Sequence, residues 1–256
     1  MFGLKKRRER KARLEAGFLP EWRDLLDDKV RFWKTLDDGE RARLEYLALG
    51  LMVDKDWEAA QGFALTDEIM MMISTQAAMI ILGLPDDSFR GVHSIIVHPT
   101  TLVMQGEHSN VKGLASDAPM AILGQASYNG PVLIVWDELQ KEARHPGRGH
   151  NVVFHEFAHK LDMLDGSVDG TPPLTDQAQF DRWVEVCTKV YERVAAGHGG
   201  HSLRHYAGVN PAEFFAVATE TFFDNPKGLK KEHLDLYEVL QQYYRQDPAH
   251  RHTRYD

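Results

Sequence analysis

The chain has 256 residues, 43% apolar and 27% charged, which is typical of a globular protein with one domain or two small ones. Its net charge of -8 argues against direct nucleic-acid binding, and its single cysteine, Cys187, excludes an internal disulfide. No apolar stretch reaches the roughly 18 residues of a membrane span, and no secretory signal is recognised, so we expect a cytoplasmic protein.

The N-terminal part is predicted to be a tail followed by helices. Residues 1–18 carry a basic cluster and are expected to form a flexible tail; the alternative is that the cluster contacts an acidic surface or partner. Pro20 begins a helical stretch, a second helix is expected over about 38–52, and a third, capped by Thr66, ends near Gly83. We therefore interpret residues 19–90 as a helical N-terminal part.

The chain changes character after residue 90. Residues 94–99 and 131–136 are rich in β-branched side chains and predict strands, and 101–104 are expected to continue the first. Residues 105–127 are polar and small and remain unassigned. Helices are predicted over about 175–195, 210–223 and 229–245. The order of elements predicts an α+β fold with a small mixed sheet, in which a C-terminal part, 91–256, forms one compact unit with 19–90.

The motif H-E-x-x-H occurs at His155-Glu156-Phe157-Ala158-His159. On a helix, positions i and i+4 lie on one face, so both imidazoles can bind one ion. Two imidazoles and a carboxylate are ligands that suit Zn²⁺ in an open tetrahedral site. The glutamate beside the first ligand is placed to take a proton from water, as in metallopeptidases. The alternative is a chance occurrence in a helix that binds nothing.

The surrounding residues favour a helix and a zinc site. Asn151 is a suitable N-cap, the residues after the motif keep a helical apolar pattern, and Gly166 suits the position just past a helix end. Without an ion, a buried helix with two histidines and a glutamate would leave polar groups unpaired, which is costly. We therefore expect one Zn²⁺ per chain.

A third ligand is sought on a helix that begins at Asn210-Pro211. This segment is apolar except for Glu213 and Glu220, which are seven residues apart and so share one face. A carboxylate on such a helix is costly unless it is paired or bound to metal. Either glutamate would complete a two-histidine, one-glutamate set. Alternatively, both are surface groups, since an acidic residue near a helix start is favourable in itself.

The chain resembles the Mlc titration factor A family of bacterial zinc peptidases. The resemblance is carried by His155 to Asp162, by Tyr206-Ala207 and by Pro211-Ala212-Glu213, and it extends from about residue 62 to 248. It implies a zincin-like metallopeptidase fold, distantly similar to the catalytic domain of anthrax lethal factor. It also implies that Glu213 is the third ligand and that Tyr206 is an active-site residue.

The resemblance further implies a gluzincin-like aminopeptidase that acts on peptides. We expect Glu156 to act as general base and Tyr206 to donate a hydrogen bond to the developing oxyanion, unless it is a packing residue. Asp162 is expected to orient a ligand histidine or to anchor the helix, and Glu220 could do likewise. Alternatively, either residue lies at the surface. Because members of the family bind the repressor Mlc, the alternative function is a regulatory protein that sequesters a transcriptional repressor.

Overall fold

The computed structural model describes residue 8 and residues 11–100 and 130–251. The first helices are α2 (Pro20–Lys29), the 3₁₀ helix η1 (Arg31–Thr35), α3 (Asp38–Asp54) and α4 (Asp67–Ile80). A capping box at Asp37 and Glu40 begins α3, and Thr66 caps α4 by accepting from the backbone of Ile69. These starts agree with the sequence predictions. In the segment expected to be a tail, residues 11–16 are helical, and Arg13 pairs with Asp67 at 2.9 Å.

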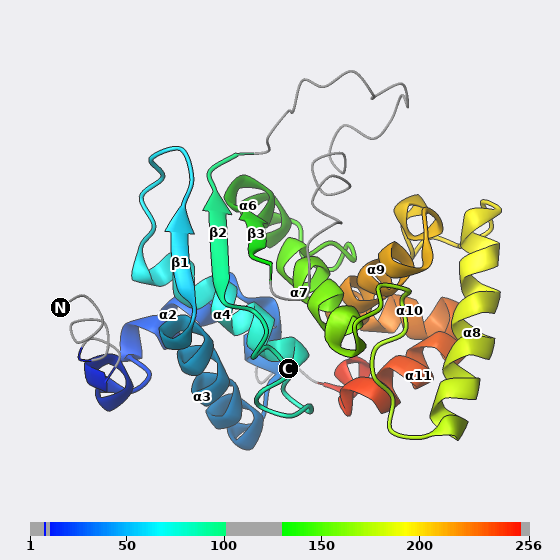
Figure 1. Cartoon of the computed structure of the whole chain (residues 1–256), viewed down its shortest axis with the longest axis horizontal. Helices are drawn as coiled ribbons and strands as arrows, with labels where there is room; N and C mark the ends of the chain where they lie inside the picture. The colour runs from blue at the N-terminus through cyan, green and yellow to red at the C-terminus, as the bar shows by residue number, and fades with distance from the viewer. Residues whose placement is uncertain (1–7, 9–10, 101–129, 252–256) are drawn as a thin grey trace.

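The described strands form a small parallel sheet in the order β1-β2-β3, from β1 (Asp56–Ala59), β2 (Ser94–His98) and β3 (Val132–Val135) (Figure 1). Trp57 pairs with Ile95, which in turn pairs with Val132. The sequence predicted β2 and β3 but missed β1, because β1 has four residues that are mostly exposed and lacks an apolar run. The α+β class is confirmed. A mixed sheet is not seen among the described strands, and residues 101–127 lie outside the described residues.

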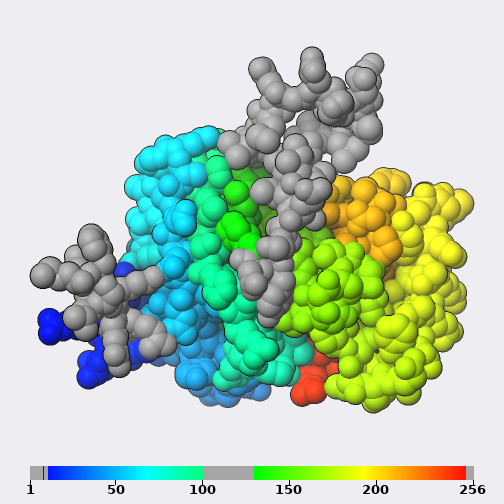
Figure 2. Space-filling view, in the orientation of Figure 1, coloured from blue at the N-terminus to red at the C-terminus, as the bar shows by residue number. Residues whose placement is uncertain are grey.

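The remaining helices surround the metal-motif helix α7. They are α6 (Trp136–Arg144), α7 (Val152–Asp162), the turn η2 (Met163–Asp165), α8 (Gln177–Ala195), η3 (His205–Gly208), α9 (Pro211–Asp224), α10 (Pro226–Glu232), α11 (Leu234–Tyr244) and η4 (Pro248–His250). Helix α7 packs against α4, α9 and β3 and therefore lies between the N-terminal helices and the C-terminal ones (Figure 1). In Figure 2 the N-terminal elements occupy one half of the visible face and the C-terminal elements the other half, with α8 at the outer edge.

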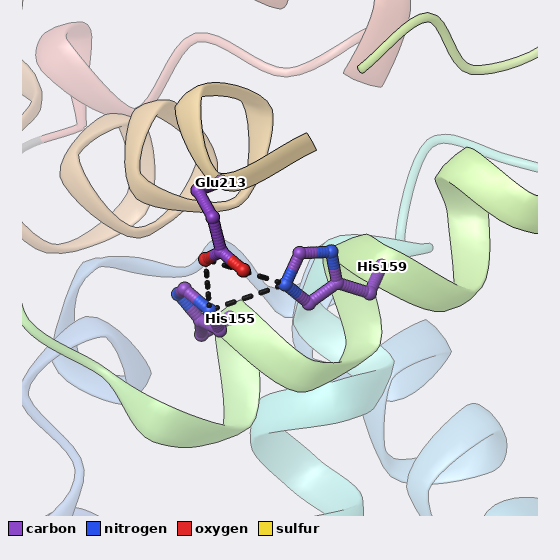
Figure 3. A group of neighbouring side chains, drawn as sticks. All are labelled: His155, His159 and Glu213. Atoms are coloured by element: carbon purple, nitrogen blue, oxygen red, sulfur yellow. Dashed lines mark hydrogen bonds and ion pairs between the residues drawn. The ribbon is translucent and has the colours of Figure 1, made fainter. Parts of the chain in front are cut away.

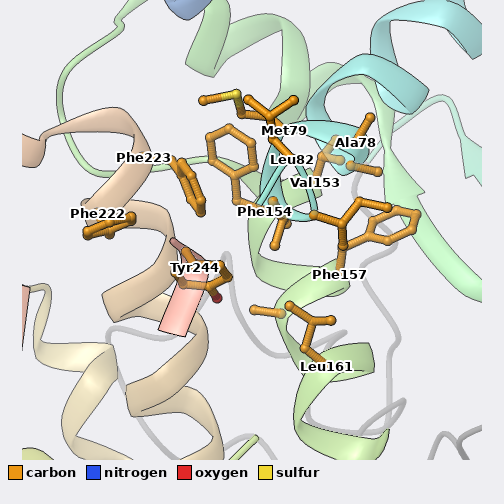
Figure 4. Close-up of a cluster of buried hydrophobic side chains, with 14 of the residues drawn as sticks. Ala78, Met79, Leu82, Val153, Phe154, Phe157, Leu161, Phe222, Phe223 and Tyr244 are labelled. Atoms are coloured by element: carbon orange, nitrogen blue, oxygen red, sulfur yellow. The ribbon is translucent and has the colours of Figure 1, made fainter. Parts of the chain in front are cut away.

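One hydrophobic core joins these elements. Phe154 projects from α7 and meets Phe223 of α9, which packs against Tyr244 of α11 (Figure 4). Phe157, also on α7, packs against Phe89. The rings of Phe154 and Phe223 lie 5.3 Å apart, centre to centre. Burial of each such side chain stabilises the fold by about 1.5–3 kcal/mol. The apolar face of α7 is thus fixed in the core, which leaves its other face to present polar groups. None of the described helices is long and apolar enough to cross a membrane.

Candidate metal centre

Helix α7 begins and ends as its sequence predicts. The side chain of its N-cap, Asn151, accepts a hydrogen bond from the backbone N–H of Phe154 at 2.9 Å. The helix ends at Asp162, and after the short turn η2 the chain leaves through Gly166 with φ of 93°. A left-handed φ of this kind is favourable for glycine, which has no Cβ. The motif therefore lies on a helix fixed at both ends.

The two histidines of the motif face one another across a single helical turn (Figure 3). His155 Nε2 and His159 Nε2 lie 3.2 Å apart, and the two ring planes are nearly perpendicular, at 81°. His155 is buried, whereas His159 is partly exposed. This arrangement leaves one side of the pair open to a third group.

Glu213 provides that third group from the first turn of α9. Asn210 caps this helix by accepting from the backbone N–H of Glu213, and Pro211 occupies the first helical position, as the sequence predicts. Glu213 Oε2 lies 3.1 Å from His155 Nε2 and 3.7 Å from His159 Nε2. This buried oxygen has no hydrogen-bond donor within the described residues. His155, His159 and Glu213 thus form a group that could hold one metal ion.

Glu220 lies behind His155 rather than beside Glu213. Its Oε1 is 2.7 Å from His155 Nδ1, and its Oε2 accepts the backbone N–H of Asn151 at 2.7 Å. Its carboxylate also pairs with the guanidinium of Arg204. An acceptor on Nδ1 fixes the proton there and leaves Nε2 free to bind a metal. Of the two glutamates that the sequence left open, the geometry therefore brings Glu213 to the metal-binding atoms and Glu220 to the outer side of a histidine.

Arg204 is the residue of this cluster that sequence reasoning missed. It precedes η3, it is separated from Glu220 by 16 positions, and no local spacing connects the two. Its guanidinium carbon also lies 5.9 Å from the centre of the Tyr206 ring. The only signal in the sequence was the buried carboxylate itself, because a charge on an apolar helix requires a partner.

The carboxylates make this site favourable for positive charge. Burial lowers the pKa of His155, but the neighbouring carboxylates of Glu213 and Glu220 outweigh that effect and raise the pKa to about 10. Burial opposes ionisation of Glu213, yet the two histidines hold the pKa of its carboxyl well below the usual range. The pKa of Glu220 is also lowered, against its burial, chiefly by Arg204 and His155. A bound cation would supply the same positive charge at this point.

Two further side chains predicted to act in the site lie close to it. Glu156 is on α7 next to His155, and burial raises the pKa of its carboxyl, against the influence of both histidines. The ring of Tyr206, on η3, lies 6.2 Å from the ring of His155. The fold therefore gathers on three elements, α7, η3 and α9, the residues that the sequence singled out.

Comparison with known proteins identifies the family of this chain. The sequence profile of a family described as glucose-regulated metallo-peptidase M90 matches residues 4–245. The chain belongs to the M90 metallopeptidase family. Proteins named Mlc titration factor A are 31% identical in Serratia proteamaculans, over 94% of this chain and 92% of the relative, and 32% identical in Pectobacterium atrosepticum, over 84% and 83%. An uncharacterized protein of Synechocystis is 30% identical over 90% of this chain and 85% of its own.

In this M90 protein, Asp162 anchors a loop instead of orienting a histidine. Its Oδ2 accepts the backbone N–H of Gly170 at 3.0 Å, and the Gly170 carbonyl accepts from the indole of Trp183 at 3.2 Å. Gly170 has φ of 79°, and a Cβ there would come 2.3 Å from the carbonyl oxygen of Pro211. The loop is thus hydrogen-bonded to the end of α7 and packed against the start of α9, which carries Glu213.

The buried carboxyl of Glu142, at the start of α7, makes the stability of this M90 protein depend on pH. Its Oε2 accepts the backbone N–H of Val152 at 2.9 Å, and burial raises the pKa of its carboxyl to about 8. Between pH 4.5 and 8 the carboxyl of Glu142 keeps a proton in the folded chain that it has lost in the unfolded chain. The free energy of unfolding therefore falls as pH rises through this range. We expect the free energy of unfolding of Glu142→Gln, relative to that of the native chain, to increase by at least about 1 kcal/mol from pH 5 to pH 8.

Urea unfolding of both proteins at the two pH values measures this difference. Glu138→Gln, on the same helix, is the matched control and should show no such gain. An equal difference in unfolding free energy at pH 5 and pH 8 would contradict the assignment.

Proposed function

We propose that this chain is a zinc-dependent metallopeptidase in which His155, His159 and Glu213 bind the ion. The observation that carries the proposal is the spacing of their three binding atoms. Tetrahedral zinc with bonds of about 2.0–2.1 Å would separate its ligand atoms by about 3.3 Å. The three separations here are 3.2, 3.1 and 3.7 Å. The hydrogen bond from His155 to Glu220 adds the outer partner that zinc-binding histidines usually have.

The residues around the ion divide the work of peptide hydrolysis among them. Zinc would supply Lewis acidity, which activates a water molecule and polarises the peptide carbonyl. Glu156 takes the proton from the water and passes it to the leaving amine. Tyr206 donates a hydrogen bond to the oxyanion that develops on the carbonyl. Glu220 and Arg204 hold the His155 ring in place while the charge in the site changes.

We further propose that the substrates are short peptides cleaved from the N-terminus and that the protein acts in the cytoplasm. The aminopeptidase assignment is supported by the resemblance to the titration factor family, and the location by the single cysteine, which suits a reducing compartment. Both follow from comparison and composition, whereas the hydrolytic chemistry follows from the site.

Metal content and hydrolysis, measured together, test the function. The chain, purified without a metal-binding tag, is expected to hold one zinc and to hydrolyse chromogenic amino-acid amides. A chelator should abolish the activity, and zinc should restore it. An amide with an acetylated N-terminus should resist cleavage if the enzyme requires a free amine. One zinc without hydrolysis of amides or of a peptide mixture would contradict the peptidase proposal, and cleavage of the acetylated substrate would contradict the aminopeptidase assignment.

A second candidate function is supported by the names of the relatives. Several relatives about 30% identical are called Mlc titration factor A, which suggests that this chain also binds a transcriptional repressor. If binding is independent of catalysis, a repressor of that kind should bind equally well to the zinc-loaded and the chelated chain. Absence of binding in both states, measured by calorimetry, would count against this function.

A further inference from the structure

A cavity of about 750 Å³ opens at the N-terminal end of α7 and is separate from the group of metal ligands. Its walls come from the end of α2, from η1, α4 and α6, from the loop before α7, and from the junction of α9 and α10. Neither His155, His159 nor Glu213 is among its lining residues. Cavities that bind small molecules have volumes of about 300–1,000 Å³ and combine apolar walls with a few polar groups.

Aromatic side chains line part of this cavity. Phe32 from η1, Phe154 from α7 and Phe223 from α9 all contribute to its walls. The ring centres of Phe32 and Phe154 are 6.0 Å apart, and those of Phe154 and Phe223 are 5.3 Å apart. Phe154 and Phe223 are buried in the core, so this apolar wall is rigid.

Two cations of the cavity have no carboxylate partner within the described ranges. Most charges of the lining are already compensated, since Lys29 pairs with Asp28, Lys34 with Asp27 and Arg251 with Glu40. Arg31 and Lys227 have no such pair among residues 11–100 and 130–251. The lining also has two carboxylates outside these pairs, Glu142 and Asp224, and each accepts hydrogen bonds from backbone N–H groups.

The same loop places these two cations on neighbouring walls. The guanidinium of Arg31 lies over Gly147, where an added Cβ would come within 2.6 Å of its Nη1. The backbone N–H groups of Gly147 and Gly149 bond to the carboxylate of Asp224, at 3.0 and 2.7 Å. Asp224 is three residues before Lys227, so Arg31 and Lys227 flank one loop. The carboxylate of Asp224 already accepts hydrogen bonds from the N–H groups of Gly147 and Gly149.

A chain of hydrogen bonds leads from this cavity to the metal centre. The lining residues Gln76 and Asn151 are joined at 2.6 Å between Gln76 Oε1 and Asn151 Nδ2. The backbone N–H of Asn151 in turn donates to Glu220, which accepts from His155. A molecule that moved Asn151 would therefore act on the group that orients His155.

We propose that this cavity is a second ligand site, which binds a small organic anion with an apolar body and is coupled to the metal centre through Asn151. The anionic group pairs with Arg31 and Lys227, and the apolar body rests against the aromatic wall. Binding itself is independent of the function proposed above, whereas the coupling rests on the proposed zinc site.

Titration with simple aromatic anions tests the binding. Benzoate and phenyl phosphate, followed by ligand-observed NMR, should bind the zinc-loaded chain with a Kd on the order of 1 mM, and neutral benzamide should bind more weakly. Arg31→Gln and Lys227→Gln should each weaken anion binding about two- to five-fold, and the double variant about ten-fold. Lys231→Gln, an exposed lysine on the same helix α10, is the matched control and should change nothing. Equal affinity of the double variant and the native chain, or no saturable binding of either anion, would overturn the proposal.

Filling the cavity provides a second, independent measurement. Ala143 lines the cavity from the exposed side of α6, so Ala143→Trp should abolish benzoate binding, whereas Ala178→Trp on the exposed side of α8 should not. Coupling is measured by competition of a chromogenic chelator for zinc. Benzoate should change the apparent zinc affinity of the native chain at least about three-fold, and not that of the Arg31→Gln/Lys227→Gln variant. An equal change in both would overturn the coupling. If the chain binds no zinc, the function above fails, but the benzoate titrations still decide the binding site.

Discussion

Glu156→Gln is expected to lower kcat/KM for amino-acid amides by about 10²- to 10⁴-fold while one zinc remains bound per chain. Glutamine has the shape of glutamate but cannot take a proton from the attacking water. The three residues proposed to bind the ion, His155, His159 and Glu213, are unchanged in this variant. Hydrolysis rates and zinc content measured on the same preparation separate loss of the base from loss of the metal.

Glu238→Gln is the matched control for the loss of one negative charge. Glu238 is exposed on α11, and its substitution should leave both hydrolysis and zinc content unchanged. The Glu156→Gln variant should also keep any affinity for a repressor, because it removes catalysis alone. Full peptidase activity in Glu156→Gln would show that the proton is taken by another group and that the assigned mechanism is wrong.

The sequence predicted those parts of the centre that depend on local chemistry. The motif and its N-cap Asn151 lie within nine residues, and the helical period alone places both histidines on one face. Helix spacing placed the third ligand only to within two candidates, and the family resemblance chose Glu213, because the choice between it and Glu220 depends on how α9 crosses α7. That packing brings Glu213 to His155 Nε2 and Glu220 to Nδ1, a distinction that no spacing along the chain contains.

The fold was predictable to a similar extent. Helices with strong caps, such as α3 and α4, begin where the sequence indicates. The strand β1 was missed because a short, exposed edge strand has no apolar alternation, and its pairing with β2 is a non-local contact. The last predicted helix, 229–245, proved to be α10 and α11 with a break at the buried residue His233, whose ring bonds to the carbonyl of Gly199.

Arg204→Met is expected to weaken zinc binding by about 10- to 100-fold, the usual effect of removing an outer partner of a metal ligand. Glu220 is only 1% exposed, and it accepts from His155 on the oxygen that also pairs with Arg204. Without the guanidinium, its buried charge loses its strongest partner, and the carboxylate no longer fixes the His155 ring. Competition with a chromogenic chelator measures the zinc affinity, and a thermal melt reports whether the variant folds.

A double-mutant cycle distinguishes this role from a general loss of stability. If Arg204 acts through Glu220, Arg204→Met should cost little further zinc affinity in a Glu220→Gln background, because the group that it positions has already changed. Arg204→Lys keeps the charge but not the planar fork and should fall between the native chain and Arg204→Met. Arg251→Met removes an arginine that is 9% exposed, against 20% for Arg204, and whose partner Glu40 is on α3; it should melt earlier without losing zinc affinity. Additive losses from Arg204→Met and Glu220→Gln would mean that the two residues support the centre separately, and Arg204 would then act on it through Tyr206 or through the fold.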